Sequence, residues 1–126
     1  MTLAEVLFAH RLAIMRYGGV EGLRDSRLLE SAMAQPQATF GCAFLHSTIA
    51  EMAGAYAYHI AKNHPFVDGN KRTAWATMRN FLLHQGWTID VVDEDAVAVM
   101  NAVCEGTIDK RELANWISDR MVSAEK

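Results

Sequence analysis

The sequence predicts one compact all-α domain over residues 1–126, a bundle of five to six helices with at most a short strand or flap. Its length of 126 residues suffices for one sizeable hydrophobic core and makes a second domain unexpected. Apolar residues make up 51% of the chain and recur at steps of three and four, the period of a core-facing helix. The chain contains only two prolines, Pro36 and Pro65, and both fall between the periodic segments. Together these observations favour a layered helical bundle.

The first half of the chain predicts three helices. The first covers residues 2–17 and ends at the Gly-Gly pair that follows, whereas a short second helix begins near Asp25, a good N-cap residue. Residues 35–45 lack a helical period and are expected to form a loop or small hairpin. A central helix is expected over residues 47–63. The first helix is expected to bury one stripe of side chains: Val6, Leu7, His10, Ile14 and Tyr17.

A second central helix is expected after Pro65, which cannot continue the first one. It covers residues 70–85 and ends at Gly86. Residues 87–89 are expected to be a short extended segment.

Two further helices are expected toward the C-terminus. One covers residues 93–104, with acids in its first turn and Gly106 as its stop. The other follows the capping-box pair Asp109 and Glu112. Its predicted buried side chains are Leu113, Trp116, Ile117 and Met121.

Composition and charge narrow the class of protein. A net charge of -3 argues against a general nucleic-acid binder, because such proteins neutralise phosphates with a basic face. No apolar run approaches the roughly 20 residues that a membrane span requires. Residues 1–5 lack the blocks of a signal peptide, and Cys42 and Cys104 lack metal-site spacing and are expected to be reduced thiols. We therefore expect a cytoplasmic protein with no direct nucleic-acid partner and no membrane association.

Residues 64–72, His-Pro-Phe-Val-Asp-Gly-Asn-Lys-Arg, carry the strongest functional signal. They place a base, a carboxylate, a glycine turn and two cations at the expected start of a helix. Cations are normally avoided in a first helical turn, where the backbone dipole is positive. Because Lys71 and Arg72 break that rule, we expect an anion beside them. Main-chain N–H groups from Gly69 onward, with the two cations, would form a phosphate site.

This pattern predicts phosphoryl or nucleotidyl transfer. Asp68 would hold a divalent cation, because Mg²⁺ takes one or two carboxylates plus substrate phosphates. His64, four residues earlier, would face the same pocket and accept a proton from an incoming hydroxyl as general base. Lys71 and Arg72 would stabilise phosphate charge. Phe66 is expected to lie in the core and to pin the loop.

The motif closely resembles that of the Fic/Doc family, which can be written H-x-F-x-[D/E]-G-N-G-R-x-x-R, whereas this chain reads HPFVDGNKRTAW. Lys71 replaces a glycine and Trp75 replaces the second arginine. Both departures are those of the Doc (death-on-curing) branch, whose motif ends in N-K-R. Residues 16–19, 22–25 and 28–32 look like the N-terminal signature of the family, so the resemblance covers most of the chain.

The resemblance implies a toxin of a toxin–antitoxin module that uses ATP and Mg²⁺. Doc-type enzymes are kinases that transfer the γ-phosphate to a threonine of elongation factor Tu and stop translation, whereas Fic enzymes generally transfer AMP. A bulky Lys71 is expected to narrow the phosphate cradle and to reverse the bound nucleotide. Lys62 stands where the branch has a phosphate-binding arginine, and Asn70 matches the asparagine that shapes the cradle.

The resemblance also implies two protein-binding surfaces. Residues 35–45 correspond to a flap that aligns the target segment by strand-like pairing. A cognate, Phd-like antitoxin would fold its C-terminal segment into a helix on the toxin surface, in a groove that no residue of the sequence identifies.

Other interpretations remain open. The same site could serve AMP transfer, and Trp75 in place of the second arginine is compatible with a catalytically silent binding module. Taken alone, His64 could simply cap or pack a helix end. His10, His46 and His84 have no partner at ligand spacing and are expected at the surface or the edge of the core.

Overall fold

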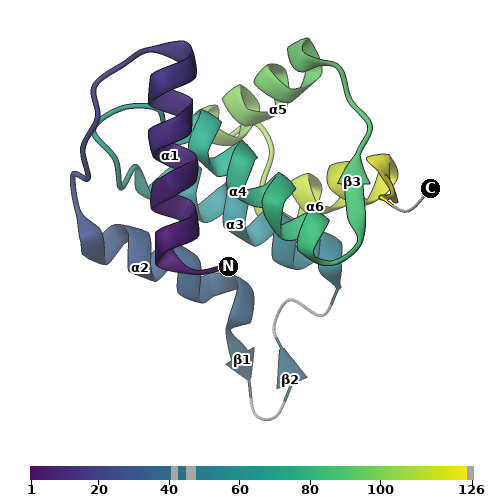
Figure 1. Ribbon diagram of the computed structural model, residues 1–126. Helices are drawn as coiled ribbons and strands as arrows, with labels where there is room; N and C mark the ends of the chain where they lie inside the picture. The colour runs from purple at the N-terminus through teal and green to yellow at the C-terminus, as the bar shows by residue number, and fades with distance from the viewer. Residues whose placement is uncertain (41–42, 45–47, 125–126) are drawn as a thin grey trace.

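A computed structural model confirms the all-α fold (Figure 1). The structure describes residues 1–40, 43–44 and 48–124. The predictions on Cys42, on His46 and on a helix start at Ser47 lie outside this part of the chain. None of its helices is long and apolar enough to cross a bilayer. The described residues form six α-helices: α1 (Leu3–Tyr17), α2 (Ser26–Ala34), α3 (Ile49–Asn63), α4 (Asn70–His84), α5 (Asp93–Glu105) and α6 (Lys110–Arg120).

The helices begin where capping residues predict. Thr2 caps α1, because its hydroxyl accepts the Glu5 N–H and its own N–H donates to the Glu5 carboxylate at 2.9 Å. The amide and hydroxyl of Thr2 lower the pKa of Glu5. Asp25 caps α2, and the predicted capping box of Asp109 with Glu112 is present at the start of α6.

Four short strands add to the helices. β1 (Thr39–Phe40) and β2 (Ala43–Phe44) pair antiparallel, which confirms a hairpin within residues 35–45; it follows the short 3₁₀ helix η1 (Gln35–Gln37) and projects from the bundle (Figure 1). β3 (Trp87–Ile89) confirms the predicted extended segment.

The end of the last predicted helix is wrong. Met121 does not continue α6 but starts β4 (Met121–Ser123), which pairs antiparallel with β3. The N–H of Asp90 also donates to the carbonyl of Arg120 at 3.0 Å. The helix therefore stops where pairing with a distant strand satisfies the backbone, which local periodicity does not show.

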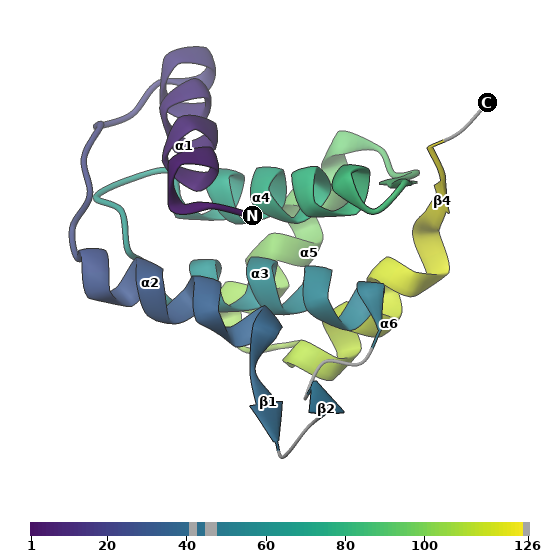
Figure 2. The same ribbon diagram turned by 60° about the horizontal axis from the view of Figure 1, so that its bottom comes forward.

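Helix α3 forms the centre of the bundle, as predicted, and packs against α2, α4, α5 and α6 (Figure 2). Its small residues let the neighbours approach closely. A Cβ on Gly54 would lie 3.4 Å from the backbone of Ala114 on α6. On the other side, α4 buries Ala74, Met78 and Leu82 completely.

The buried face of α1 differs from the predicted stripe. Its buried residues are Val6, Ala9, His10 and Ala13, whereas Leu7 and Tyr17 are exposed and Ile14 is half-buried. The helix packs against α4, and the small side chains of Ala9 and Ala13 permit close approach. The stripe is therefore rotated, and His10 belongs to the interior rather than to its edge.

Candidate active site

The predicted motif forms the loop between α3 and α4 together with the first turn of α4. His64 is the C-cap of α3 and adopts a left-handed backbone conformation with φ 48°. Phe66 is 1% exposed and anchors the loop in the core, as predicted. His64, Val67 and Asp68 remain exposed. The loop thus has a buried anchor and a solvent-facing edge that carries the reactive groups.

Asn70 holds the loop in this shape. Its side-chain oxygen accepts the N–H of Phe66 at 2.9 Å, and its side-chain nitrogen donates to the carbonyl of Phe66 at 3.0 Å. The side-chain nitrogen also lies 3.3 Å from Nδ1 of His64. Asn70 is 8% exposed and therefore shapes the loop from within the protein.

The contact with Asn70 also bears on the tautomer of His64. Because the two bonds to Phe66 fix which end of the amide is the donor, Nδ1 of His64 faces an N–H group. Nδ1 is then the acceptor, and the neutral ring carries its hydrogen on Nε2. Nε2 makes no hydrogen bond with any residue in the described part of the chain.

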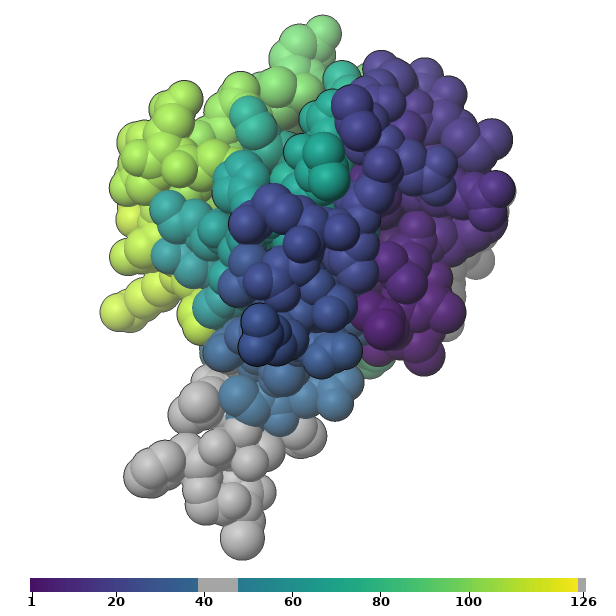
Figure 3. Space-filling view, turned by 90° about the vertical axis from the view of Figure 1, so that its left-hand side faces the viewer, coloured from purple at the N-terminus to yellow at the C-terminus, as the bar shows by residue number. Residues whose placement is uncertain are grey.

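The segment between α1 and α2 braces the loop from outside. The N–H groups of Arg24 and Asp25 donate to the carbonyl of Pro65 at 2.7 and 3.0 Å, and the N–H of Val67 donates to Gly22. The guanidinium of Arg24 donates to the carbonyl of His64 at 2.8 Å. In Figure 3 this segment, in dark blue, runs across the teal residues that precede α4. Two distant parts of the sequence therefore form one site.

Asp68 is the carboxylate that could hold a cation. One of its oxygens accepts the N–H of Gly69 at 2.8 Å, and the other accepts the N–H of Val20 at 3.2 Å. Each oxygen keeps a further lone pair. Among the described residues, no three His, Cys, Asp or Glu side chains gather as a metal site. A cation here would rest on Asp68, water and ligand oxygens, which suits Mg²⁺.

The start of α4 has an open anion-binding geometry. Its N-cap, Gly69, has φ 75° and supplies no side chain to the free amides. The N–H groups of Asn70, Lys71 and Arg72 belong to the first turn, where no intrahelical partner exists. These amides and the dipole of α4 favour a negative group.

Lys71 and Arg72 lie in the first turn of α4, whereas Lys62 lies on α3, and each of the three predicted cations has its own partner. The ammonium of Lys71 donates to the Asn101 side chain on α5 at 2.9 Å and retains two further N–H groups. The guanidinium of Arg72 lies 4.4 Å from the ring centre of Tyr17, a cation–π contact. Lys62 lies on the last turn of α3, with its ammonium 6.0 Å from the ring centre of Tyr58. In the described part of the chain, no hydrogen bond or ion pair joins Lys62 to the start of α4, so its phosphate role stays a prediction.

Sequence reasoning missed His10. It lies on α1, is 4% exposed, and its Nε2 donates to the carbonyl of Asp68 at 2.8 Å. Its only sequence signal is a histidine at a position of α1 that faces the core. Arg24 likewise supports the loop, because its guanidinium donates to the carbonyls of His64 and Asn63.

Comparisons with known proteins identify the relatives of this chain. The model of the Fic/DOC family matches residues 1–82, which include the whole motif. The chain is 37% identical over 112 residues to "Toxin Doc" of Mycolicibacterium smegmatis, an alignment that covers 87% of this chain and 84% of that protein. It is 29% identical over 122 residues to "Protein kinase doc" of Escherichia phage P1, with 96% and 94% covered.

Proposed function

The chain belongs to the Fic/DOC family, and from that membership we propose that it transfers the γ-phosphate of ATP to a protein hydroxyl as the toxin of a toxin–antitoxin module. One observation carries the proposal: His64, Asp68 and the uncapped start of α4 lie on a single braced loop. The names of the two relatives support the toxin role and the kinase reaction. The proposed target is a threonine of elongation factor Tu, and the proposed partner is a Phd-like antitoxin.

Each site residue has a defined role in this proposal. The amides of Asn70, Lys71 and Arg72 bind phosphate oxygens, and the free N–H groups of Lys71 add positive charge. Asp68 would hold Mg²⁺, which when bound neutralises charge on the phosphate oxygens. The side chain of Arg72 is kept beside the helix end by Tyr17.

The transfer step follows from these positions. The oxygen of the acceptor hydroxyl forms a bond to the γ-phosphorus as the bond from that phosphorus to the bridging oxygen breaks. The bridging oxygen leaves as part of ADP. His64 accepts the hydroxyl proton at Nε2, so that charge does not accumulate on the attacking oxygen.

This role requires His64 to change tautomer. With Asn70 donating to Nδ1, a neutral ring has its hydrogen on Nε2. When the exposed ring turns away from the long 3.3 Å contact, water can accept the hydrogen of Nε2 and donate one to Nδ1, which leaves Nε2 as the acceptor. We propose that the acceptor hydroxyl promotes this change when it hydrogen-bonds to Nε2.

Intact mass analysis of the target tests the proposal. Purified elongation factor Tu is incubated with this protein, ATP and Mg²⁺, and a gain of about 80 Da is expected for one phosphate. A gain of about 329 Da instead would show AMP transfer, the second candidate reaction of this scaffold. No change in mass with any protein target, together with no growth arrest on expression, would favour a silent binding module.

Gly19 provides a prediction about Asp68. A Cβ on Gly19 would lie 2.7 Å from Oδ2 of Asp68 and 3.1 Å from Ile14, and Gly19 has φ 120°. Gly19→Ala is therefore expected to displace the Asp68 carboxylate and to lower kcat by about tenfold or more, because small displacements of site groups reduce rates strongly. Steady-state kinetics with ATP and Mg²⁺ measure the loss.

Gly18 is the matched control for this variant. It has φ 83°, and a Cβ there would meet nothing within 4 Å. Gly18→Ala shares the backbone strain, about 1–3 kcal/mol of unfolding free energy, without the clash. If both variants lose the same fraction of kcat, the clash with Asp68 is not the cause.

A further inference from the structure

His10 is held between two parts of the catalytic loop. Its ring stacks on Phe66 with a centroid separation of 3.8 Å and an interplanar angle of 6°. Its Nε2 donates to the carbonyl of Asp68 at 2.8 Å. A Cβ on Gly69 would lie 3.7 Å from the same nitrogen. One buried side chain of α1 thus contacts Phe66 and Asp68 and lies beside Gly69, in a loop to which it does not belong.

The hydrogen bond from His10 fixes the orientation of one peptide unit. In a trans peptide the C=O and N–H groups point in opposite directions. With the carbonyl of Asp68 directed at His10, the N–H of Gly69 points away from α1 and reaches Oδ1 of Asp68. This N–H therefore lies on the solvent-facing edge of the loop, next to the free amides of α4.

A flip of this peptide would reverse the direction of its dipole beside the start of α4. The carbonyl oxygen of Asp68 would then lie beside the first turn of α4 and repel an anion there. Gly69 opposes such a flip less than any other residue type would, because glycine adopts both signs of φ readily. Within the loop, the bond from the Gly69 N–H to the exposed Asp68 carboxylate opposes the flip, and from outside the loop His10 opposes it because its ring is bonded to that carbonyl.

We propose that His10 is a positioning residue for the transfer reaction: it locks the Asp68–Gly69 peptide so that its N–H faces the phosphate site. This inference rests on the proposed function, because the lock matters only if an anion binds at α4. His10 touches neither ATP nor the acceptor in this proposal.

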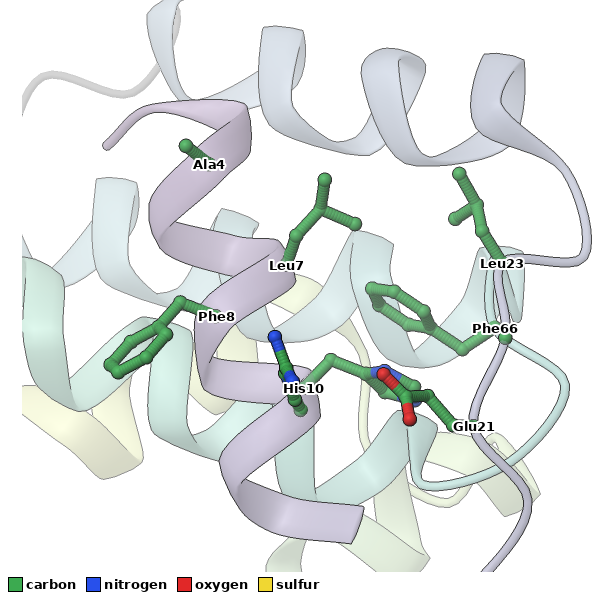
Figure 4. Close-up of a pocket in the computed structure, with 9 residues that line it drawn as sticks. Ala4, Leu7, Phe8, His10, Glu21, Leu23 and Phe66 are labelled. Atoms are coloured by element: carbon green, nitrogen blue, oxygen red, sulfur yellow. The ribbon is translucent and has the colours of Figure 1, made fainter. Parts of the chain in front are cut away.

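Packing alone does not account for the arrangement. His10 and Phe66 border a pocket of about 400 Å³ between α1 and the segment that follows it, which Leu7, Glu21 and Leu23 also line (Figure 4). His10 is 4% exposed, so packing encloses it, but the stack and the 2.8 Å hydrogen bond are the directional contacts that fix how its ring is turned.

Two variants separate the hydrogen bond from the ring. His10→Phe keeps a flat ring for the stack with Phe66 but cannot donate to Asp68. His10→Gln loses the ring but can place an amide N–H near the position of Nε2. The full-length protein labelled with ¹⁵N provides a readout that needs no turnover, namely the Gly69 amide signal and its relaxation dispersion on the μs–ms scale.

We expect the two variants to rank in one order by kcat and in the opposite order by Tm. His10→Phe should lower kcat by about 10²-fold and should shift or broaden the Gly69 signal, while its Tm stays near that of the wild type. His10→Gln should keep a wild-type Gly69 signal and a kcat within about threefold of wild type, even if its Tm is lower.

Three outcomes would overturn the proposal. The Gly69 signal and kcat of His10→Phe could both match the wild type; both variants could lose kcat in proportion to Tm; or the Gly69 signal could change with kcat unaltered. A wild-type protein that transfers nothing would refute the proposed function instead, and the Gly69 signal of His10→Phe would still decide whether the lock exists.

Discussion

His64→Gly is expected to abolish transfer and, at the same time, to make the protein more stable. His64 has φ 48°, and a left-handed conformation costs a residue with a Cβ roughly 1–2 kcal/mol. Glycine is the usual residue at such a position after a helix. It also makes the unfolded chain more flexible, which offsets part of the gain, so we expect a net increase of up to about 1 kcal/mol in unfolding free energy.

The loss of activity follows from the loss of the imidazole. A positioned general base contributes about 10²–10⁴-fold to rate, so kcat should fall within that range and growth arrest should disappear. His64→Ala is the matched control, since it removes the imidazole and keeps the Cβ. Both variants should be equally inactive, with glycine the more stable by about 1 kcal/mol. Phosphate transfer and thermal unfolding measure the two effects.

A glycine variant that retained activity would remove His64 from the mechanism. A glycine variant less stable than the alanine variant would show that the His64 backbone is not strained. If both expectations hold, the chain keeps a histidine where glycine would fold better, which is the behaviour expected of a reactive position.

The sequence predicted the helices well because local signals define them. Caps at Thr2, Asp25 and Asp109 and stops at Gly86 and Gly106 act within one turn, and the structure places helix ends beside each. β4 was missed because Met121 leaves the helix to pair with a strand more than thirty positions earlier. No local period reports that contact.

The site was predictable in its reactive groups and not in its supports. His64, Asp68 and Asn70 lie on one short loop, so their spacing alone brought them together. The contacts that hold the loop come from residues 10–25, and their partners cannot be paired from one sequence. His10 was placed on the expected apolar stripe of α1 but at the surface or the edge of the core, and its full burial was not predicted because the face that α1 buries depends on its packing against α4.

The role assigned to Asn70 also changes, because its hydrogen-bond partners could not be identified from the sequence. The family resemblance implied that it shapes the phosphate cradle. In the structure its side chain is hydrogen-bonded to both the N–H and the carbonyl of Phe66. Asn70 therefore acts on the cradle through the loop backbone. It also acts on His64, because its amide nitrogen faces Nδ1. One buried amide thus shapes the loop that carries the anion site and sets the resting tautomer of His64.

Asn70→Ala is accordingly expected to cost both stability and activity. The substitution leaves the N–H and carbonyl of Phe66 without their partner, and Phe66 is 1% exposed, so solvent cannot readily replace the lost bonds. Each buried unpaired group costs about 1–3 kcal/mol, which predicts a loss of about 3 kcal/mol in unfolding free energy. Denaturant unfolding measures this loss.

Asn63→Ala is the matched control, because Asn63 makes a single side-chain hydrogen bond, to the carbonyl of Leu28, and is half-buried. Its expected cost is about 1 kcal/mol. At a temperature where both variants are folded, Asn70→Ala should also lose kcat by about tenfold or more, because the loop that carries His64 and leads into the α4 amides loses its internal support. Equal unfolding free energies for the two variants would contradict the proposed support of the loop by the two bonds from Asn70 to Phe66. An unchanged kcat in Asn70→Ala would show that the transfer reaction does not depend on this support.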